Sequence, residues 1–146
     1  IHQPLHCSGR VTTLEPAGDQ GGNLFLITPA DAPKTDNLHW YWDSILTRSI
    51  PRVNDEPDSI YIANLASTLT KKHPAKEFAD KLKAGKFDQW QQEGFEIATT
   101  EVYPASLKRN QMPSENYRKR AAAIAEQRLA LAGYRMANLL NQIFAS

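Results

Sequence analysis

Proline and glycine divide this chain into a broken first part and a longer helical remainder. Within residues 1–36 they recur every few positions, at Pro4, Pro16, Pro29, Pro33 and in the cluster 18–22. Proline removes a backbone donor and glycine leaves the backbone flexible, so no long helix or strand can continue through these residues. Two β-like runs, 10–14 and 23–28, flank a loop that is typical of a hairpin. The first 36 residues are therefore predicted to be irregular, with one small β-hairpin.

After residue 36 the apolar side chains recur every three or four positions, which is the period of an amphipathic helix. The first helical segment is expected to begin with Asp36 as its N-cap and to end before Pro51. Its apolar face is formed by Leu38, Trp42 and Ile45. Trp42 is therefore expected to lie in the core rather than to stack on a ligand.

The rest of the chain predicts four further helices, expected over 58–71, over 75–83, from Phe87 to near Pro104, and from about Ser114 onward. In the first of these, the candidate core residues are Ile60, Leu65 and Leu69. The last is the longest, and its apolar stripe is formed by Tyr117, Ala121, Ile124, Ala132, Met136, Leu140 and Ile143. The fold class is thus predicted to be mostly α, a helical bundle with one small β-hairpin.

Length and charge narrow the class of protein further. The chain has 146 residues, of which 41% are hydrophobic, and this matches one globular domain with a packed core. Its 17 Lys and Arg nearly balance its 16 Asp and Glu, so it lacks the long-range field of a dedicated duplex-binding or membrane-coating protein. No apolar run approaches the roughly 18 residues of a spanning helix, and no transmembrane segment is expected.

Two histidines and an aspartate are the strongest chemical signal. His39 and Asp43 are four residues apart in a helical segment, so their side chains leave the same face about one turn apart. Together with His6 they form a ligand set that leaves a position open on zinc, as catalytic zinc sites do. The other interpretation is a surface histidine paired with Asp43 and an unrelated His6, because such helical pairs are common.

Three sequence runs resemble consecutive signatures of a known family. These are IHQPLH at 1–6, DQGGN at 19–23 and NLHWYWD at 37–43. They are similar to motifs of the zinc-dependent, single-strand-preferring type I nucleases and 3′-nucleotidases, which share their helical fold with bacterial zinc-dependent phospholipase C. The later residues Trp90, Glu93, Val102 and Tyr103 and the run AGYRMANLLN at 132–141 also resemble this family.

The resemblance implies a zinc cofactor and assigns its ligands. In the family's pattern His6, His39 and Asp43 hold one ion of a three-zinc cluster. The remaining ligands, and the aspartate expected to activate the nucleophilic water, belong to a part of the protein upstream of this chain. Residues 1–146 are thus expected to form the C-terminal part of a single nuclease-like domain, with the N-terminal part as its partner.

Four further residues are expected to support the site without binding the metal in the family's pattern. His2 lies four residues before His6 and is expected to orient a ligand or to bond within the core. In the DQGGN run, Asp19 or Asn23 is expected to fix the tautomer of an imidazole. Gly22, with its neighbouring glycine, is expected to let the backbone approach a ligand closely.

The function that the resemblance implies is hydrolysis of single-stranded RNA and DNA to 5′-nucleotides, with 3′-nucleotidase activity, in a secreted or periplasmic protein. This chain alone is expected to be nearly inactive, because it supplies ligands for one ion only. Two alternatives remain: a phospholipase C of the same fold, and an inactive fragment acting as a binding module. The DQGGN run favours the nuclease over the phospholipase.

Overall fold

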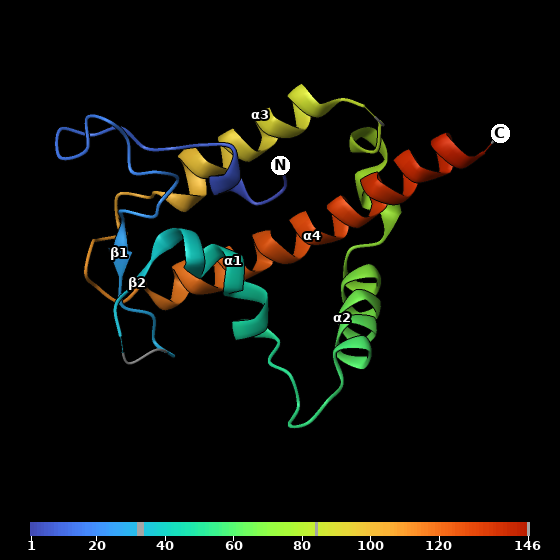
Figure 1. Cartoon of the computed structure of the whole chain (residues 1–146), viewed down its shortest axis with the longest axis horizontal. Coiled ribbons are helices and arrows are strands. Elements are labelled where there is room, and N and C mark those ends of the chain that lie inside the picture. The colour runs from blue at the N-terminus through green and yellow to red at the C-terminus, as the bar shows by residue number, and fades with distance from the viewer. Residues whose placement is uncertain (32–33, 84, 146) are drawn as a thin grey trace.

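The computed structural model describes residues 1–31, 34–83 and 85–145 and shows a mostly helical protein, as predicted. Helix α4 (Glu115–Phe144) runs through the length of the molecule, with α3 (Phe87–Ile97) along one side and α2 (Asp58–Lys72) on the other (Figure 1). Helices α1 (Leu38–Ser49) and α2 both pack against α4. Among the described residues, no helix combines the length and apolarity needed to cross a membrane.

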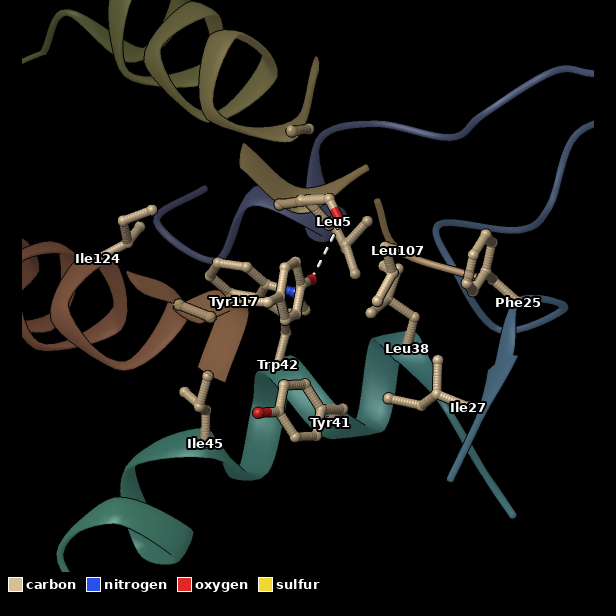
Figure 2. Close-up of a cluster of buried hydrophobic side chains, with 13 residues drawn as sticks. Leu5, Phe25, Ile27, Leu38, Tyr41, Trp42, Ile45, Leu107, Tyr117 and Ile124 are labelled. Carbon is tan, nitrogen blue, oxygen red and sulfur yellow. Dashed lines mark hydrogen bonds between the residues drawn. The ribbon is translucent and has the colours of Figure 1, made fainter. Parts of the chain in front are cut away.

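Helix α1 is positioned by a cap at one end and a buried face along its length. Its N-cap is Asn37, whose side chain accepts a hydrogen bond from the backbone of Trp40, rather than the expected Asp36. As predicted, Trp42 is buried (Figure 2). Its indole Nε1 donates to the hydroxyl of Tyr117 over 2.9 Å, and that hydroxyl donates to the carbonyl of Val102. These bonds fix α1 against α4.

The small β-hairpin exists, but the predicted strand pairing was wrong. Strand β1 (Leu26–Ile27) pairs antiparallel with β2 (Asp36–Asn37), with Leu26 opposite Asn37. The run 10–14 forms no strand, because a tight turn occupies it: the backbones of Thr12 and Glu15 exchange two hydrogen bonds. Arg10, the first residue of this run, donates its backbone N–H to the carboxylate of Asp19. Pro33 lies outside the described residues.

The middle of the chain follows the predicted order of helices with local differences. Helix α2 ends one residue later than predicted, and the short helix η2 (Ala75–Lys81) is 3₁₀ rather than α. Helix α3 continues into the π-helical turn η3 (Ala98–Val102). Of the candidate core residues on α2, Leu69 is buried, whereas Ile60 is about half exposed and Tyr61 is buried in its place.

The long helix α4 begins near Ser114, as predicted, and the side chain of Ser114 caps it. The first part of the predicted apolar stripe is buried, at Tyr117, Ala121 and Ile124. Its last members are exposed: Met136, Leu140 and Ile143. The buried face continues instead through three residues at spacings of three and four, Arg128, Leu131 and Arg135.

Candidate metal centre

His6, His39 and Asp43 meet at one point on the surface. His6 ends the 3₁₀ turn η1 (Pro4–His6), whereas His39 and Asp43 stand one turn apart at the start of α1. The carboxylate of Asp43 contacts both imidazoles: its Oδ1 is 3.1 Å from His6 Nε2, and its Oδ2 is 3.5 Å from His39 Nε2. One donor atom from each residue lies within 4.8 Å of the other two.

The cluster is open to solvent on one side. The two imidazole rings stack with centroids 5.0 Å apart and an interplanar angle of 17°. The His6 side chain is 47% exposed and that of Asp43 is 30% exposed, whereas His39 is more enclosed. A ligand from solution can therefore reach the donor atoms, which is the arrangement of a catalytic rather than a sealed structural metal site.

The tautomer of His39 is set by a backbone carbonyl. Its Nδ1 lies 2.8 Å from the carbonyl oxygen of Gly21, an atom that can only accept a hydrogen bond. Nδ1 therefore donates to this carbonyl, and in the neutral ring the lone pair is on Nε2, the nitrogen that faces Asp43. Metal-binding histidines in proteins are commonly held in this way, by a hydrogen bond from the ring nitrogen that does not touch the metal.

The two glycines of the DQGGN run allow this close approach. Gly21 has φ of +63° and Gly22 has φ of +86°, in the region that glycine adopts most readily. A Cβ atom on Gly21 would lie 2.7 Å from the carbonyl oxygen of Leu5, and one on Gly22 would lie 3.2 Å from the backbone nitrogen of His39. The loop can pass between η1 and α1 only without side chains at these positions.

Asp19 and Asn23 do not contact the imidazoles, so the expected role of fixing a tautomer belongs to the Gly21 carbonyl instead. Asp19 is fully buried and accepts hydrogen bonds from the backbone of Arg10 and Gly22 and from the hydroxyl of Tyr103. Burial, as the larger cause, and the hydrogen bond to Asp19 raise the pKa of Tyr103. Its hydroxyl therefore stays protonated and donates to Asp19.

Asn23 donates its side-chain amide to the carbonyl of Gln20. Gln20 has φ of +56°, so this bond closes a strained turn at the start of the glycine pair. Asp19 and Asn23 therefore hold the shape of the loop that presents the Gly21 carbonyl, rather than touching a histidine themselves.

The ring of His2 contacts Arg135 and Trp90 rather than the cluster. Its Nε2 is 3.0 Å from Nη1 of Arg135, and its ring lies against Trp90. Burial lowers the pKa of His2 from 6.5 to about 4, with the nearby guanidinium groups of Arg128 and Arg135 acting in the same direction. His2 is therefore neutral near pH 7 and accepts a hydrogen bond from Arg135.

Two buried arginines of α4 anchor the segment that carries the cluster. Arg128 donates to the carbonyl of His2 and to Glu93 on α3, and Arg135 donates to Glu93 and stacks on Trp90. Burial acts to raise the pKa of Glu93, but the hydrogen bonds and charges of both arginines outweigh it and lower that pKa. Sequence reasoning missed this network, although two arginines seven residues apart continue the helix's apolar face.

The donor set fits a zinc ion. Imidazole nitrogen and carboxylate oxygen are ligand types that zinc binds in proteins, and one such atom from each of the three residues lies within 4.8 Å of the other two. Both nitrogens that face Asp43 are Nε2, and in the neutral ring of His39 this is the nitrogen that carries the lone pair. The arrangement supplies three ligands and leaves a position for water or substrate.

Comparison with protein families gives one match that spans the chain. The family model described as S1/P1 Nuclease matches residues 1–145. Comparison with curated proteins gave no match. The matched range includes the turn that carries His6, the glycine loop and the helix that carries His39 and Asp43.

Proposed function

The chain belongs to the S1/P1 nuclease family, and from this premise we propose that it binds one zinc ion through His6, His39 and Asp43 and serves zinc-dependent phosphodiester hydrolysis. The observation that supports the zinc site is the convergence of two imidazoles and a carboxylate, whose donor atoms all lie within 4.8 Å of one another. The substrates are single-stranded RNA and DNA, cleaved to 5′-nucleotides, with 3′-nucleotidase activity.

The chain's own residues prepare the site for this chemistry. The carbonyl of Gly21 accepts from Nδ1 of His39, which leaves Nε2 of the neutral ring as the nitrogen that can bind a cation. The exposed side of the cluster leaves room for a phosphate group. When bound, zinc supplies Lewis-acid chemistry: it polarises a phosphoryl oxygen and lowers the pKa of a bound water toward about 7.

The proposal includes the place of this chain in a larger active site. Residues 1–146 form the C-terminal part of a single nuclease-like domain that is secreted or periplasmic. The aspartate that activates the nucleophilic water, and the ligands of two further zinc ions, lie upstream. This part of the proposal rests on the resemblance of the motifs.

A zinc count combined with a substrate comparison tests the proposal. The 146 residues are expected to bind one zinc per chain, to lose it to EDTA and to show almost no turnover of single-stranded RNA. The full-length protein is expected to cleave single-stranded RNA and DNA faster than duplex, in an EDTA-sensitive reaction, and to leave phosphatidylcholine intact.

Each outcome has a distinct meaning. Chains without zinc would contradict the ligand assignment, and robust EDTA-sensitive turnover by the 146 residues alone would contradict the upstream catalytic aspartate. Preferential cleavage of phosphatidylcholine by the full-length protein would show that it acts as a phospholipase C rather than as a nuclease.

A further inference from the structure

We propose that Gln3 is a positioning residue for the metal centre: one amide side chain shapes the turn that carries His6 and orients the carboxylate of Asp43. This inference rests on the proposed zinc site. Gln3 lies in the IHQPLH run between the two histidines, and no metal-binding role is assigned to it above.

The side chain of Gln3 bonds to both segments of the cluster. Its Oε1 accepts the backbone N–H of Leu5 and so caps the turn η1, and its backbone carbonyl accepts the N–H of His6 over 3.1 Å. Its Nε2 donates to Oδ1 of Asp43 over 2.9 Å, across 40 residues of sequence. One residue therefore connects the turn that holds His6 to the helix that holds Asp43.

The partners of the amide fix which end faces which group. Leu5 offers a donor, which only the Oε1 of Gln3 can accept, and Asp43 offers acceptors, to which only Nε2 can donate. A flipped amide would place an NH₂ group against an N–H and an oxygen against a carboxylate. Both contacts would then be repulsive, so this orientation is the stable one.

The carboxylate of Asp43 needs such a partner. The terminal torsion of an aspartate is broad, and this side chain is 30% exposed, so packing alone leaves the carboxylate free to rotate. The bond from Gln3 holds Oδ1, and this fixes the plane in which Oδ1 faces His6 and Oδ2 faces His39. Holding a ligand before the metal arrives reduces the conformational freedom lost on binding.

Shortening the side chain by one methylene separates the two roles of Gln3. In Gln3→Asn the amide oxygen still caps the turn, because asparagine is a good N-cap, but the NH₂ is drawn back from Asp43 by about 1.5 Å. We expect the zinc dissociation constant of the full chain to rise about 10- to 100-fold. The visible absorption of the cobalt(II)-loaded chain should change, while the thermal midpoint without metal stays at the wild-type value.

A matched control exists on α3. The amide of Gln92 also donates to a carboxylate, that of Glu96, at 3.3 Å on an exposed helix surface. Gln92→Asn makes the same chemical change with the same kind of partner and should leave the zinc affinity and the cobalt spectrum unchanged. Should Gln3→Asn fail to fold, Gln3→Glu takes its place, because it keeps the capping acceptor and loses the donor to Asp43.

The outcomes separate this inference from the proposed function. If Gln3→Asn has the zinc affinity and the cobalt spectrum of the wild type, the role of Gln3 is overturned and the zinc site still stands. If Gln3→Glu is used instead, a wild-type cobalt spectrum has the same meaning. A wild-type chain that binds no zinc overturns the site itself, and the role of Gln3 with it. Weakened binding or an altered spectrum in the Gln3 variant, with Gln92→Asn unaffected, supports the inference.

Discussion

Two histidine–carboxylate pairs in this molecule share one spacing and differ in their surroundings. His39 and Asp43 on α1 are four residues apart with a closest approach of 3.5 Å, and His73 at the end of α2 and Glu77 on η2 are four apart at 3.6 Å. Their histidine side chains are similarly enclosed, at 22% and 16% exposure. By sequence spacing and by pair distance, the two are nearly equivalent.

The difference lies in what the rest of the fold brings to each pair. The α1 pair receives a third donor from His6, a carbonyl from Gly21 and an amide from Gln3. In the other pair Nδ1 of the imidazole faces Glu77, and Nε2 has no hydrogen-bond partner among the described residues, with Glu126 at 3.8 Å. Spacing aligns two side chains, but segments distant in sequence supply the remaining ligands and supports.

The largest expected effect comes from removing either ligand of the α1 pair. His39→Ala and Asp43→Ala should each lose one zinc per chain. Nuclease activity of the full-length protein should fall more than about 100-fold, because a loss of about 100-fold is the most expected for a residue that only positions a ligand. The measurements are zinc content by atomic emission and turnover of single-stranded RNA. His73→Ala is the matched control and should keep its zinc. Zinc retained in His39→Ala would overturn the ligand assignment.

The next largest effect should come from the loop that holds His39. Gly21→Ala places a Cβ 2.7 Å from the Leu5 carbonyl at φ of +63°, so the loop must shift and the bond to Nδ1 weakens. Zinc affinity should fall about 10- to 100-fold, measured by competition with a chelator.

Gly85→Ala is the control for Gly21→Ala, because it introduces the same kind of backbone strain without a steric clash. Gly85 also has positive φ, at +73°, but nothing lies within 4 Å of an added Cβ. This variant should lose a little thermal stability and keep the wild-type zinc affinity. Equal zinc affinity in the Gly21→Ala and Gly85→Ala variants would show that the carbonyl does not support the site.

A smaller effect is expected at His2, which has the same four-residue spacing to His6. His2→Ala should keep its zinc and lose at most about 10- to 100-fold in zinc affinity or activity, because His2 bonds to Arg135 rather than to the cluster. Loss of a whole zinc would make His2 a ligand and contradict this structure.

The pH dependence of stability gives a second measurement on this variant. The pKa of His2 is about 4 in the folded chain and 6.5 as its ordinary value, so its stabilising contribution is complete above pH 6.5. Between pH 6.5 and 4 the unfolded chain takes up the proton first, and this contribution is lost. The difference in thermal midpoint between wild type and His2→Ala should narrow over this range.

The smallest effect is expected for the second pair itself. Glu77→Gln removes a half-exposed partner of His73 and should change the free energy of unfolding by about 0.5 kcal/mol or less, with zinc content unchanged. Urea unfolding and atomic emission measure the two quantities. A drop in bound zinc would mean that the two pairs are not as different as their surroundings indicate.

Much of the helical structure could be predicted because its signals are local. The end of α1 before Pro51, the start of α4 near Ser114 and the burial of Trp42 follow from proline, helix start signals and a repeat of three or four residues. The N-cap of α1 was misplaced by one residue, since Asp36 and Asn37 both suit that role. The side chain of Asp36 instead accepts a hydrogen bond from Arg48.

The pairing of the strands and the burial of α4 could not be predicted in the same way. The run 10–14 has β-like composition, but its backbone bonds within its own turn, and the pairing with β1 is taken by residues 36–37. On α4 the stripe of apolar residues drifts away from the buried face. Arg128 and Arg135 are buried because both pair with the carboxylate of Glu93 and Trp90 covers one of them, which no property of α4 alone predicts.

The sequence by itself determined which side chains can donate to a metal, and it aligned His39 with Asp43, because a helix places residues four apart on one face. Only the tertiary structure decided that His6 joins them and that a carbonyl of Gly21 and an amide of Gln3 support them. The physical reason is that a backbone carbonyl has no side-chain signature. A hydrogen bond across 18 or 40 residues forms only when packing brings its two ends together.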